Sequence, residues 1–436
     1  MYKFLVSLIL FSFFNAVGIT QELSRRANFE AKIAWPDNVR PGAEIVELSQ
    51  HTPLAKAGLK TNDIILAVNG RSVLTQEAWS AILYAIRADQ PTQIIAKRGQ
   101  ERIQVSVQLK PYALEKYEGV EIFYESITNN YGQLQRTITS KPRGNEKRPA
   151  ILLLQGLSCS SVEQYSGRSN NWVKLIQDLV TKSNMIVMRV EKPGVGDSEG
   201  DCGKVDFKTE LSGYEAAIQA LKNKPYVDTS KIIVYGNSMG SALAPYVANK
   251  YNLAGVISDG TFFKSWYEHM LEIERRILEI EGKDQATIYE LMNEVYIPLY
   301  HQMLIEKKSF AEILTQNPLY RKHHRQGLLH MYGRSMEYYH QIQDFNFAKA
   351  WQEIQVPVRI RWGTNDWIMS EFDNDMIIEV LEKKGHQDHV LYKYPKLDHW
   401  STIHPDYSAS FYGKQGKWED QISQQIIDWA WGIVKK

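Results

Sequence analysis

The chain has 436 residues, of which 51 are basic and 50 acidic, so its formal net charge is +1. Such an even balance gives no electrostatic basis for binding nucleic acid or an anionic membrane surface. With 44% hydrophobic residues the composition is that of a globular protein, and the length favours two domains. The function therefore has to be inferred from local sites.

The first residues have the form of a secretory signal peptide. Lys3 is followed by an apolar run over residues 4–14 and then by small residues, which predicts cleavage near residues 18–20. The apolar run is shorter than the roughly 20 residues that a transmembrane helix needs. We therefore expect residues 1–20 to be a signal peptide and the mature protein to be periplasmic or secreted, with no membrane span.

Residues 25–111 show the pattern of a small domain of strands with one helix. Apolar residues alternate in AEIVEL and in DIILAV, as in half-buried strands, and the pair Asn69 and Gly70 predicts a hairpin turn. Apolar residues recur at helical spacing over residues 75–87. Two further strands are predicted in TQIIAKRG and ERIQVSVQL.

The stretch TPLAKAGLKTNDIILAVNG in this domain resembles the core signature of PDZ domains of the bacterial envelope type. The resemblance implies a small α+β fold with a peptide groove beside the helix that carries Trp79 and Leu83, where a ligand binds by strand addition. Residues 28–33, NFEAKI, depart from the family's apolar-glycine loop, so binding of free peptide C-termini is not implied. The alternative is a domain that only packs against the one that follows it.

Beyond residue 117 strands and helices alternate. The segments GVEIFYESI and LQRTITSKP predict a hairpin, and the apolar runs AILLL, MIVMRV and KIIVY predict strands buried on both faces of a parallel sheet. Strand patterns are absent from residues 262–350, which have helical patterns, and return in VPVRIRWG and HVLYKYP. We therefore expect residues 118–436 to form an α/β domain with a helical cap inserted at residues 262–350.

The stretch YGNSMGS places Ser238 between Gly236 and Gly240, where the strand KIIVY ends and a helix begins. A serine on such a tight turn is forced into unfavourable backbone angles, and side chains at the flanking positions would collide with the neighbouring strand or helix. Its hydroxyl then lies beside the first N–H groups of the helix, which can stabilise an oxyanion. Ser238 is therefore the candidate nucleophile. Pro245, further along the helix, predicts a kink or a lost hydrogen bond.

A serine nucleophile requires a base and an orienting acid. Ten of the eleven histidines follow Ser238, so the order serine, acid, histidine is expected along the chain. Asp366 and His399 are the candidate acid and base, because each follows a predicted strand and the carboxyl ends of parallel strands share one edge of the sheet. The alternative that Asp366 only forms the turn after its strand remains open. The sequence also leaves open Asp259 as the acid and His389 or His404 as the base, and Asp398 is expected to be a solvated neighbour.

Together, GNSMGS, GTND and LDHW resemble the motifs of the α/β-hydrolase fold, and the resemblance covers residues 118–436. It implies a mostly parallel sheet with helices on both faces. It also implies a serine hydrolase in which Ser238 is the nucleophile, Asp366 the acid and His399 the base.

The same resemblance implies an oxyanion hole at the backbone N–H groups of Met239 and Leu157. Leu157 lies in the loop QGLSCSS after the strand AILLL, where Gln155 replaces the histidine usual in the family. The two cysteines of the sequence, Cys159 and Cys202, follow strands that are neighbours in this fold. The fold therefore implies a disulfide that supports the oxyanion loop, as suits an exported protein.

The leading functional hypothesis is an exported serine hydrolase that cleaves carboxylic esters through an acyl-enzyme. A peptidase or acyl-peptide hydrolase would use the same three residues, and a catalytically inert peptide-binding protein is the third hypothesis. The expected partners are a small-molecule ester or peptide substrate and a peptide or protein ligand at the PDZ-like groove. The sequence contains no metal-ligand spacing, phosphate loop or dinucleotide motif, so no cofactor or metal is expected.

Overall fold

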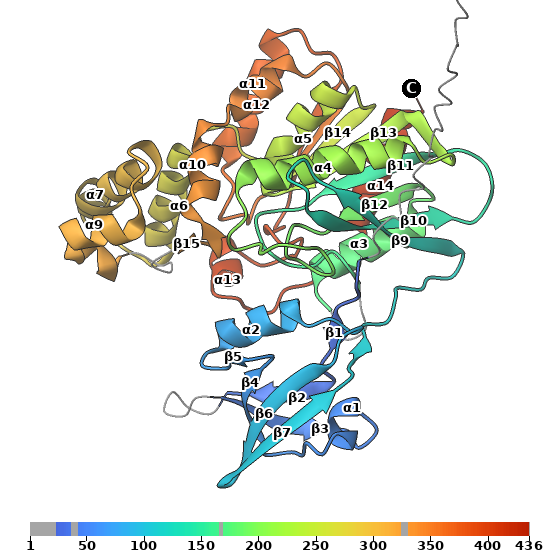
Figure 1. Cartoon of the computed structure of the whole chain (residues 1–436). Helices are drawn as coiled ribbons and strands as arrows, with labels where there is room; N and C mark the ends of the chain where they lie inside the picture. The colour runs from blue at the N-terminus through green and yellow to red at the C-terminus, as the bar shows by residue number, and fades with distance from the viewer. Residues whose placement is uncertain (1–22, 36–41, 165–168, 324–329, 436) are drawn as a thin grey trace, which may run out of the picture.

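The structure is a computed structural model that describes four stretches, residues 23–35, 42–164, 169–323 and 330–435. The predicted signal peptide at residues 1–20 lies outside the described residues. Figure 1 shows two lobes, a small one coloured blue to cyan and a large one formed by the rest of the chain. Within the described part of the chain, no helix has the length and apolar character needed to cross a bilayer.

The small lobe has the predicted α+β fold of a PDZ domain. Its elements are β2 (Ala31–Ala34), β3 (Ala43–Leu48), α1 (Pro53–Lys56), β4 (Ile64–Val68), β5 (Arg71–Ser72), α2 (Gln76–Ala85), β6 (Thr92–Arg98) and β7 (Glu101–Val107). The strands form one sheet in the order β2-β3-β4-β6-β7, with β5 paired to β4. Asn69 and Gly70 have positive φ angles of 47° and 76°, so the predicted hairpin turn between β4 and β5 is confirmed.

Trp79 of α2 lies in the core of the small lobe. It is 6% exposed and packs edge to face on Phe29, with 4.9 Å between the ring centroids. Leu83, one turn later, is half-buried against the same core. Of the two side chains expected beside a peptide groove, Trp79 is therefore used for packing, because the chain before β2 places an aromatic ring against the helix.

The large lobe is built on one eight-stranded sheet. Its strands are β9 (Val120–Thr128), β10 (Leu134–Pro142), β11 (Arg148–Leu154), β12 (Ile186–Val190), β13 (Val227–Asn237), β14 (Gly255–Asp259), β17 (Val358–Gly363) and β18 (His389–Tyr394). They are arranged in the order β18-β17-β14-β13-β11-β12-β10-β9. All neighbouring pairs are parallel except the pairs that β10 makes with β9 and β12, so the predicted hairpin and parallel sheet are confirmed.

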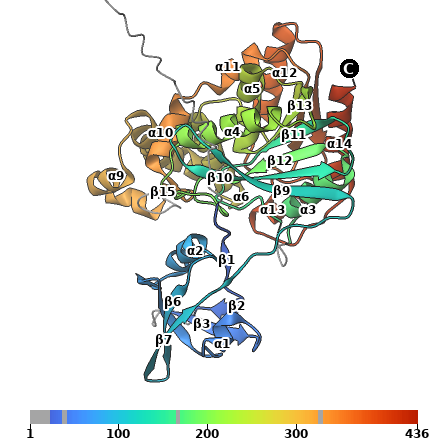
Figure 2. The same cartoon turned by 45° about the vertical axis from the view of Figure 1, so that its right-hand side comes forward.

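Helices cover both faces of this sheet (Figure 2). They are α3 (Asn171–Lys182), α4 (Phe207–Lys222), α5 (Met239–Tyr251), α12 (Glu371–Lys383) and α14 (Gln421–Val434). Along β11, Leu152 and Leu154 join the core formed with α4, α5 and α12, whereas Ile151 and Leu153 join the core formed with α3 and α14. Alternate residues are thus buried on opposite faces, which confirms the predicted fold class.

Pro245 lies inside α5 without ending it. A proline lacks the N–H that would bond the carbonyl four residues earlier, here that of Ser241. The hydroxyl of Ser258, on β14, donates to the Ser241 carbonyl oxygen at 2.9 Å. A side chain from the sheet therefore replaces the hydrogen bond that the sequence predicts to be lost.

A cap of mainly helical segments is inserted between β14 and β17 (Figure 1). The cap begins with α6 (Trp266–Ile280) and ends with α11 (Phe347–Glu353). Ser265 and Glu268 form a capping box at the N-terminus of α6. Between them lie α7 (Gln285–Leu291), α8 (Ile297–Tyr300), α9 (Phe310–Gln316) and α10 (Met336–Asp344). The cap also contains a small ladder of β15 (His330–Met331) and β16 (Arg334–Ser335), which was not expected because two-residue strands show no periodicity.

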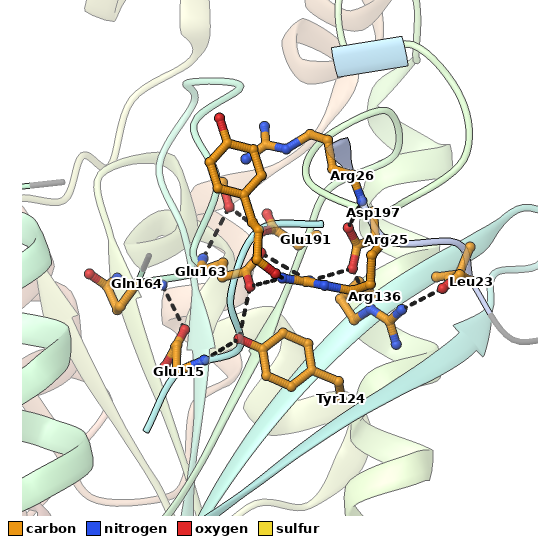
Figure 3. A network of polar contacts seen from close by, with 12 residues as sticks. Leu23, Arg25, Arg26, Glu115, Tyr124, Arg136, Glu163, Gln164, Glu191 and Asp197 are labelled. Carbon is orange, nitrogen blue, oxygen red and sulfur yellow. Dashed lines mark hydrogen bonds and ion pairs between the residues drawn. The ribbon is translucent and has the colours of Figure 1, made fainter. Parts of the chain in front are cut away.

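Arg25, at the start of the small lobe, joins the two lobes. Its guanidinium lies 2.6 Å from the carboxylate of Asp197 and 2.6 Å from that of Glu163 (Figure 3). Both carboxylates are buried in the large lobe. Asp197 also accepts a hydrogen bond from the backbone N–H of Arg26 at 2.8 Å and pairs with Arg136 at 3.1 Å. Part of the charge that balances these carboxylates therefore comes from the small lobe.

Candidate active site

Ser238 lies on the turn between β13 and α5 with φ 56° and ψ −125°, an unfavourable conformation for a residue with a side chain. A Cβ atom on Gly236 would lie 2.3 Å from the carbonyl oxygen of Gly240. A Cβ atom on Gly240 would lie 2.1 Å from the carbonyl oxygen of Leu154. Close approach of backbone to backbone therefore requires glycine on both sides of the serine.

Two loops at the same sheet edge bring Asp366, after β17, and His399, after β18, to Ser238. The Nε2 atom of His399 lies 2.9 Å from Ser238 Oγ, and its Nδ1 atom lies 2.8 Å from Asp366 Oδ2. The other oxygen of Asp366 accepts hydrogen bonds from the N–H groups of Ile368 and Met369 at 2.9 and 2.8 Å. A hydroxyl beside an imidazole that a carboxylate orients has the geometry of an activated nucleophile.

The ring of His399 is buried, with 6% of its side chain exposed. Burial alone favours the neutral ring and lowers the pKa of His399. The charge and the hydrogen bond of Asp366, together with the charges of Asp398 and Asp259, act against burial, and the pKa lies above its ordinary value of 6.5. A raised pKa makes the imidazole a stronger base toward the Ser238 hydroxyl.

Asp259, the rival acid, has different partners. Its two carboxylate oxygens accept hydrogen bonds from Arg361 at 2.8 and 2.5 Å, and one of them also accepts from the hydroxyl of Tyr235 at 2.9 Å. The structure therefore places Asp366, and not Asp259, in hydrogen-bond contact with His399.

The rival bases are also engaged elsewhere. His389 is the first residue of the edge strand β18, and its Nδ1 atom lies 3.0 Å from the backbone carbonyl oxygen of His386. The Nε2 atom of His404 lies 3.3 Å from Asp398. Asp398 is 5% exposed and accepts two backbone N–H groups of the loop after His399. The expectation of a solvated Asp398 is therefore wrong, because this carboxylate is needed to shape the loop.

Both residues expected to form the oxyanion hole lie beside Ser238. Met239 is the first residue of α5, so its N–H belongs to the first turn, whose donors have no partner within the helix. Leu157 lines the same cavity as Ser238. The preceding Gly156 is so close that a Cβ atom on it would lie 2.9 Å from the Cβ of Ser238. Gln155 is 4% exposed and also lines the cavity.

Cys159 and Cys202 form the predicted disulfide, with their Cα atoms 6.0 Å apart. They follow β11 and β12, which are parallel neighbours in the sheet. The bond joins residues 155–159, here called the oxyanion loop, to the segment that follows β12. The loop that carries Leu157 is therefore covalently tied at its far end.

A cavity of about 540 Å³ lies between the cap and the sheet edge, with Ser238 and His399 in its wall. Most of the wall is apolar, including Trp172, Phe262, Trp266, Ile273, Trp367 and Trp400. Among the described residues that line it, none is Asp, Glu, Lys or Arg. His269 of α6 also lines it, and burial lowers the pKa of His269 to about 3, so this ring is neutral. The cavity suits an uncharged, apolar group.

A metal or cofactor site was not expected from the sequence. Across the described ranges, no three His, Cys, Asp or Glu side chains are grouped so that they could hold a metal ion.

The fold and the arrangement around Ser238 define a serine hydrolase of the α/β-hydrolase fold that carries an N-terminal PDZ domain. The chain belongs to the family described as "Serine aminopeptidase, S33", whose model matches residues 162–405. Residues 18–109 match the model of the PDZ domain.

Several proteins of known description are similar to parts of this chain. "Esterase EstD" of Thermotoga maritima is 22% identical over 324 residues, which is 73% of this chain and 70% of that protein. "Serine protease HTRA1" of Xenopus laevis is 38% identical over 73 residues, which is 17% of this chain and 15% of the protease. Among solved structures, Est1E of Butyrivibrio proteoclasticus with bound ferulic acid is 13% identical, with a TM-score of 0.47 over 71% of this chain and 99% of Est1E.

One buried cluster at the site was not anticipated from the sequence. It consists of Lys192, Glu210 and Arg334, which are 1%, 2% and 0% exposed. Lys192 follows β12, Glu210 lies on α4 and Arg334 on β16 of the cap. Residues so far apart share no spacing or motif, so no local signal in the sequence could have grouped them.

Proposed function

We propose that this chain is an exported carboxylesterase in which Ser238 is the nucleophile, His399 transfers the proton and Asp366 orients His399. The observation that carries the proposal is the pair of hydrogen bonds made by one imidazole ring, 2.9 Å to Ser238 Oγ and 2.8 Å to Asp366 Oδ2. In a catalytically inert binding protein, nothing would require these three side chains to keep this geometry.

The proposed reaction has two halves. Ser238 Oγ bonds to the ester carbonyl carbon while its proton passes to His399 Nε2, and the carbonyl oxygen becomes an oxyanion that faces the N–H groups of Met239 and Leu157. The tetrahedral intermediate then expels the alkoxide, which takes the proton from His399 and leaves as an alcohol. In the second half, His399 takes a proton from a water molecule as the water oxygen bonds to the acyl carbon. The second tetrahedral intermediate then expels Ser238 Oγ, which regains the proton from His399, and the carboxylic acid leaves.

The lining of the cavity favours an ester over the N-terminus of a peptide. An aminopeptidase has to bind the ammonium group of its substrate, and a desolvated cation requires a nearby carboxylate. None of the described lining residues is Asp or Glu, and His269 is neutral. An uncharged acyl group with aromatic or branched aliphatic character fits these walls better.

A peptidase that cleaves blocked or internal peptide bonds is the second candidate, and the match to a PDZ domain is the observation that favours it. A peptide ligand would add to β2, which stands at one end of the small sheet. Leu83, half-buried on α2, is the proposed contact for a ligand side chain.

We propose further that the protein acts in the periplasm or outside the cell. The disulfide between Cys159 and Cys202 supports this location, because such bonds persist in oxidising compartments. N-terminal sequencing of the protein from its native cells tests the proposal. A mature chain that begins after residues 18–20 is expected, whereas an intact Met1 in the cytosolic fraction would contradict export.

The decisive experiment compares p-nitrophenyl esters of short and aromatic acids with aminoacyl p-nitroanilides, using wild type, Ser238→Ala and Ser160→Ala. Ser160 is half-buried, lines the same cavity and lies outside the oxyanion loop, so S160A is a matched control. We expect ester turnover in wild type and S160A and none in S238A, with the same pattern of labelling by a fluorophosphonate. Faster turnover of the anilides would favour the peptidase, and a wild type that is neither active nor labelled would favour an inert protein.

A further inference from the structure

Two buried cations hold the backbone of the oxyanion loop. Lys192 Nζ donates to the carbonyl oxygen of Gly156 at 2.5 Å, and Arg334 Nη1 donates to the carbonyl oxygen of Leu157 at 3.3 Å. Glu210 pairs with both cations, with its Oε1 atom 3.1 Å from Lys192 Nζ and its Oε2 atom bonded to Arg334 Nη2. Consecutive carbonyls of one loop are thus held by charges from two distant parts of the chain.

Stability alone does not account for this cluster. Burying two cations and one carboxylate carries a desolvation cost that apolar residues of similar volume would avoid. Arg334 also lies 3.4 Å from the sulfur of Cys202, so it contacts the disulfide that ties the same loop. The charged groups, the disulfide and the loop carbonyls therefore converge on the peptide units next to Ser238.

The first of these peptide units contains both the carbonyl of Gly156 and the N–H of Leu157. No described peptide bond is cis, and in a trans peptide the carbonyl and the N–H point in opposite directions. Lys192, by holding the oxygen on one side, directs the N–H of Leu157 to the other side. The positive charge of Lys192, which lies beside the Gly156 carbonyl oxygen, also polarises this peptide unit and strengthens its N–H as a donor.

We propose that Lys192 and Arg334 are positioning residues of the oxyanion hole, which set the direction of the Leu157 N–H by holding the two carbonyls of the oxyanion loop. This inference rests on the proposed function, since it needs an oxyanion to form at Ser238. Neither side chain touches the substrate. Arg334 belongs to the cap, so the cap contributes to the hole as well as to the cavity wall.

The protonation of Lys192 provides a readout. The charged groups that face Lys192 are Glu210 of α4 and Arg334 of β16. Burial lowers the pKa of Lys192 to about 8. The charge of Glu210 raises this pKa, whereas the charge of Arg334 lowers it further. Loss of the ammonium charge at mildly alkaline pH weakens the hold on the Gly156 carbonyl. Ester turnover should then fall as the pH rises through this value.

The test compares Lys192→Met, Lys192→Arg and the matched control Lys222→Met. Lys222 also donates to a backbone carbonyl, that of Tyr251 at 2.6 Å, but belongs to α4 away from the cavity lining. We expect K192M to lower kcat/KM for an ester by about 10–100-fold, somewhat less than removal of one oxyanion-hole donor. Affinity for a trifluoromethyl ketone, whose adduct with Ser238 carries an oxyanion, should fall by a similar factor.

Binding of the matching secondary alcohol, which forms no oxyanion, should not change in K192M. K192R should recover most of the activity and lack the alkaline decline seen in wild type, because arginine does not titrate in this range. K222M should behave as wild type. A folded K192M with wild-type kcat/KM and ketone affinity would overturn the inference.

Should K192M fail to fold, Arg334→Met and Arg334→Lys repeat the comparison at the second carbonyl. The inference is supported if R334M binds the ketone more weakly than wild type and R334K binds it as wild type does. Equal ketone affinity in R334M, R334K and wild type contradicts it. Failure of the proposed function is a separate outcome, since it would appear as a wild type without esterase activity or labelling of Ser238.

Discussion

Arg361 binds Asp259 through two hydrogen bonds, from Nε to Oδ1 at 2.8 Å and from Nη2 to Oδ2 at 2.5 Å. The two residues are register partners on the adjacent strands β17 and β14, and both side chains are buried. Both carboxylate oxygens of Asp259 thus accept hydrogen bonds from the guanidinium of Arg361. Asp366, on the loop after β17, instead directs one carboxylate oxygen to His399 and the other to two backbone N–H groups.

The two aspartates should therefore respond differently to the same substitution. Asp366→Asn should lower kcat/KM by about 10⁴-fold with little change in stability, because the imidazole loses its orienting charge. Asp259→Asn should lower the free energy of unfolding by about 3 kcal/mol, because it leaves Arg361 buried without a counter-charge. Steady-state kinetics and urea denaturation measure the two effects. A larger kinetic loss in the folded D259N protein than in D366N would mean that Asp259 is the acid.

The pH dependence of kcat/KM should report the raised pKa of His399. The neutral ring is the active form of a general base, so kcat/KM should rise with pH and its inflection should lie above 6.5, the ordinary value. The protonated ring is stabilised by Asp366 in the folded state. Its contribution to stability is therefore present below the unfolded pKa and is lost as the pH rises through the folded pKa.

Asp366→Asn provides the control for this profile. Without the carboxylate, burial dominates, and the inflection of the residual activity should move to lower pH. An inflection that stays in place in D366N would show that another group controls the rate.

The glycines around the turn should be intolerant of the smallest side chain. Gly240→Ala places a Cβ 2.1 Å from the Leu154 carbonyl oxygen, so the turn has to open, and we expect loss of both activity and soluble protein. Gly432→Ala is the matched control, because nothing lies within 4 Å of a Cβ there and α14 is helical. G432A should raise the free energy of unfolding by about 0.5–1 kcal/mol. An active, stable G240A would refute the proposed steric requirement.

Arg25 should couple the stability of the two lobes. Arg25→Gln leaves the buried carboxylates of Asp197 and Glu163 short of counter-charge, so the large lobe should lose about 3 kcal/mol of stability. Cleavage by a protease between residues 112 and 117 should also become faster, because the small lobe is less firmly docked. Urea denaturation and timed digestion measure these effects.

Lys32→Gln is the control for Arg25, since Lys32 and Glu47 form an ion pair on the surface of the small lobe with 66% and 69% of their side chains exposed. This change should leave both measurements as in wild type. Equal behaviour of R25Q and K32Q would show that the network in Figure 3 does not hold the lobes together.

Local patterns in the sequence were sufficient to predict the PDZ domain, the parallel sheet and the candidate nucleophile. Gly236, Ser238 and Gly240 lie within five residues, so the turn is visible as a local motif, although the contact that excludes a side chain at Gly240 is with Leu154 of the neighbouring strand β11. Asp366 and His399 were predictable because each directly follows a strand of the same sheet edge. The pairing of Cys159 and Cys202 needed the fold as well, since it depends on which strands are neighbours.

The tertiary structure alone decided which acidic residue is available to His399, how Trp79 is used and what surrounds the oxyanion loop. Asp259 and Asp366 both follow the pattern of an acid at a strand end, and only the position of Arg361 distinguishes them. Lys192, Glu210 and Arg334 come from three distant segments. Periodicity and motifs record contacts between residues close in sequence, whereas the burial of a charge depends on partners that the folded chain brings from far away.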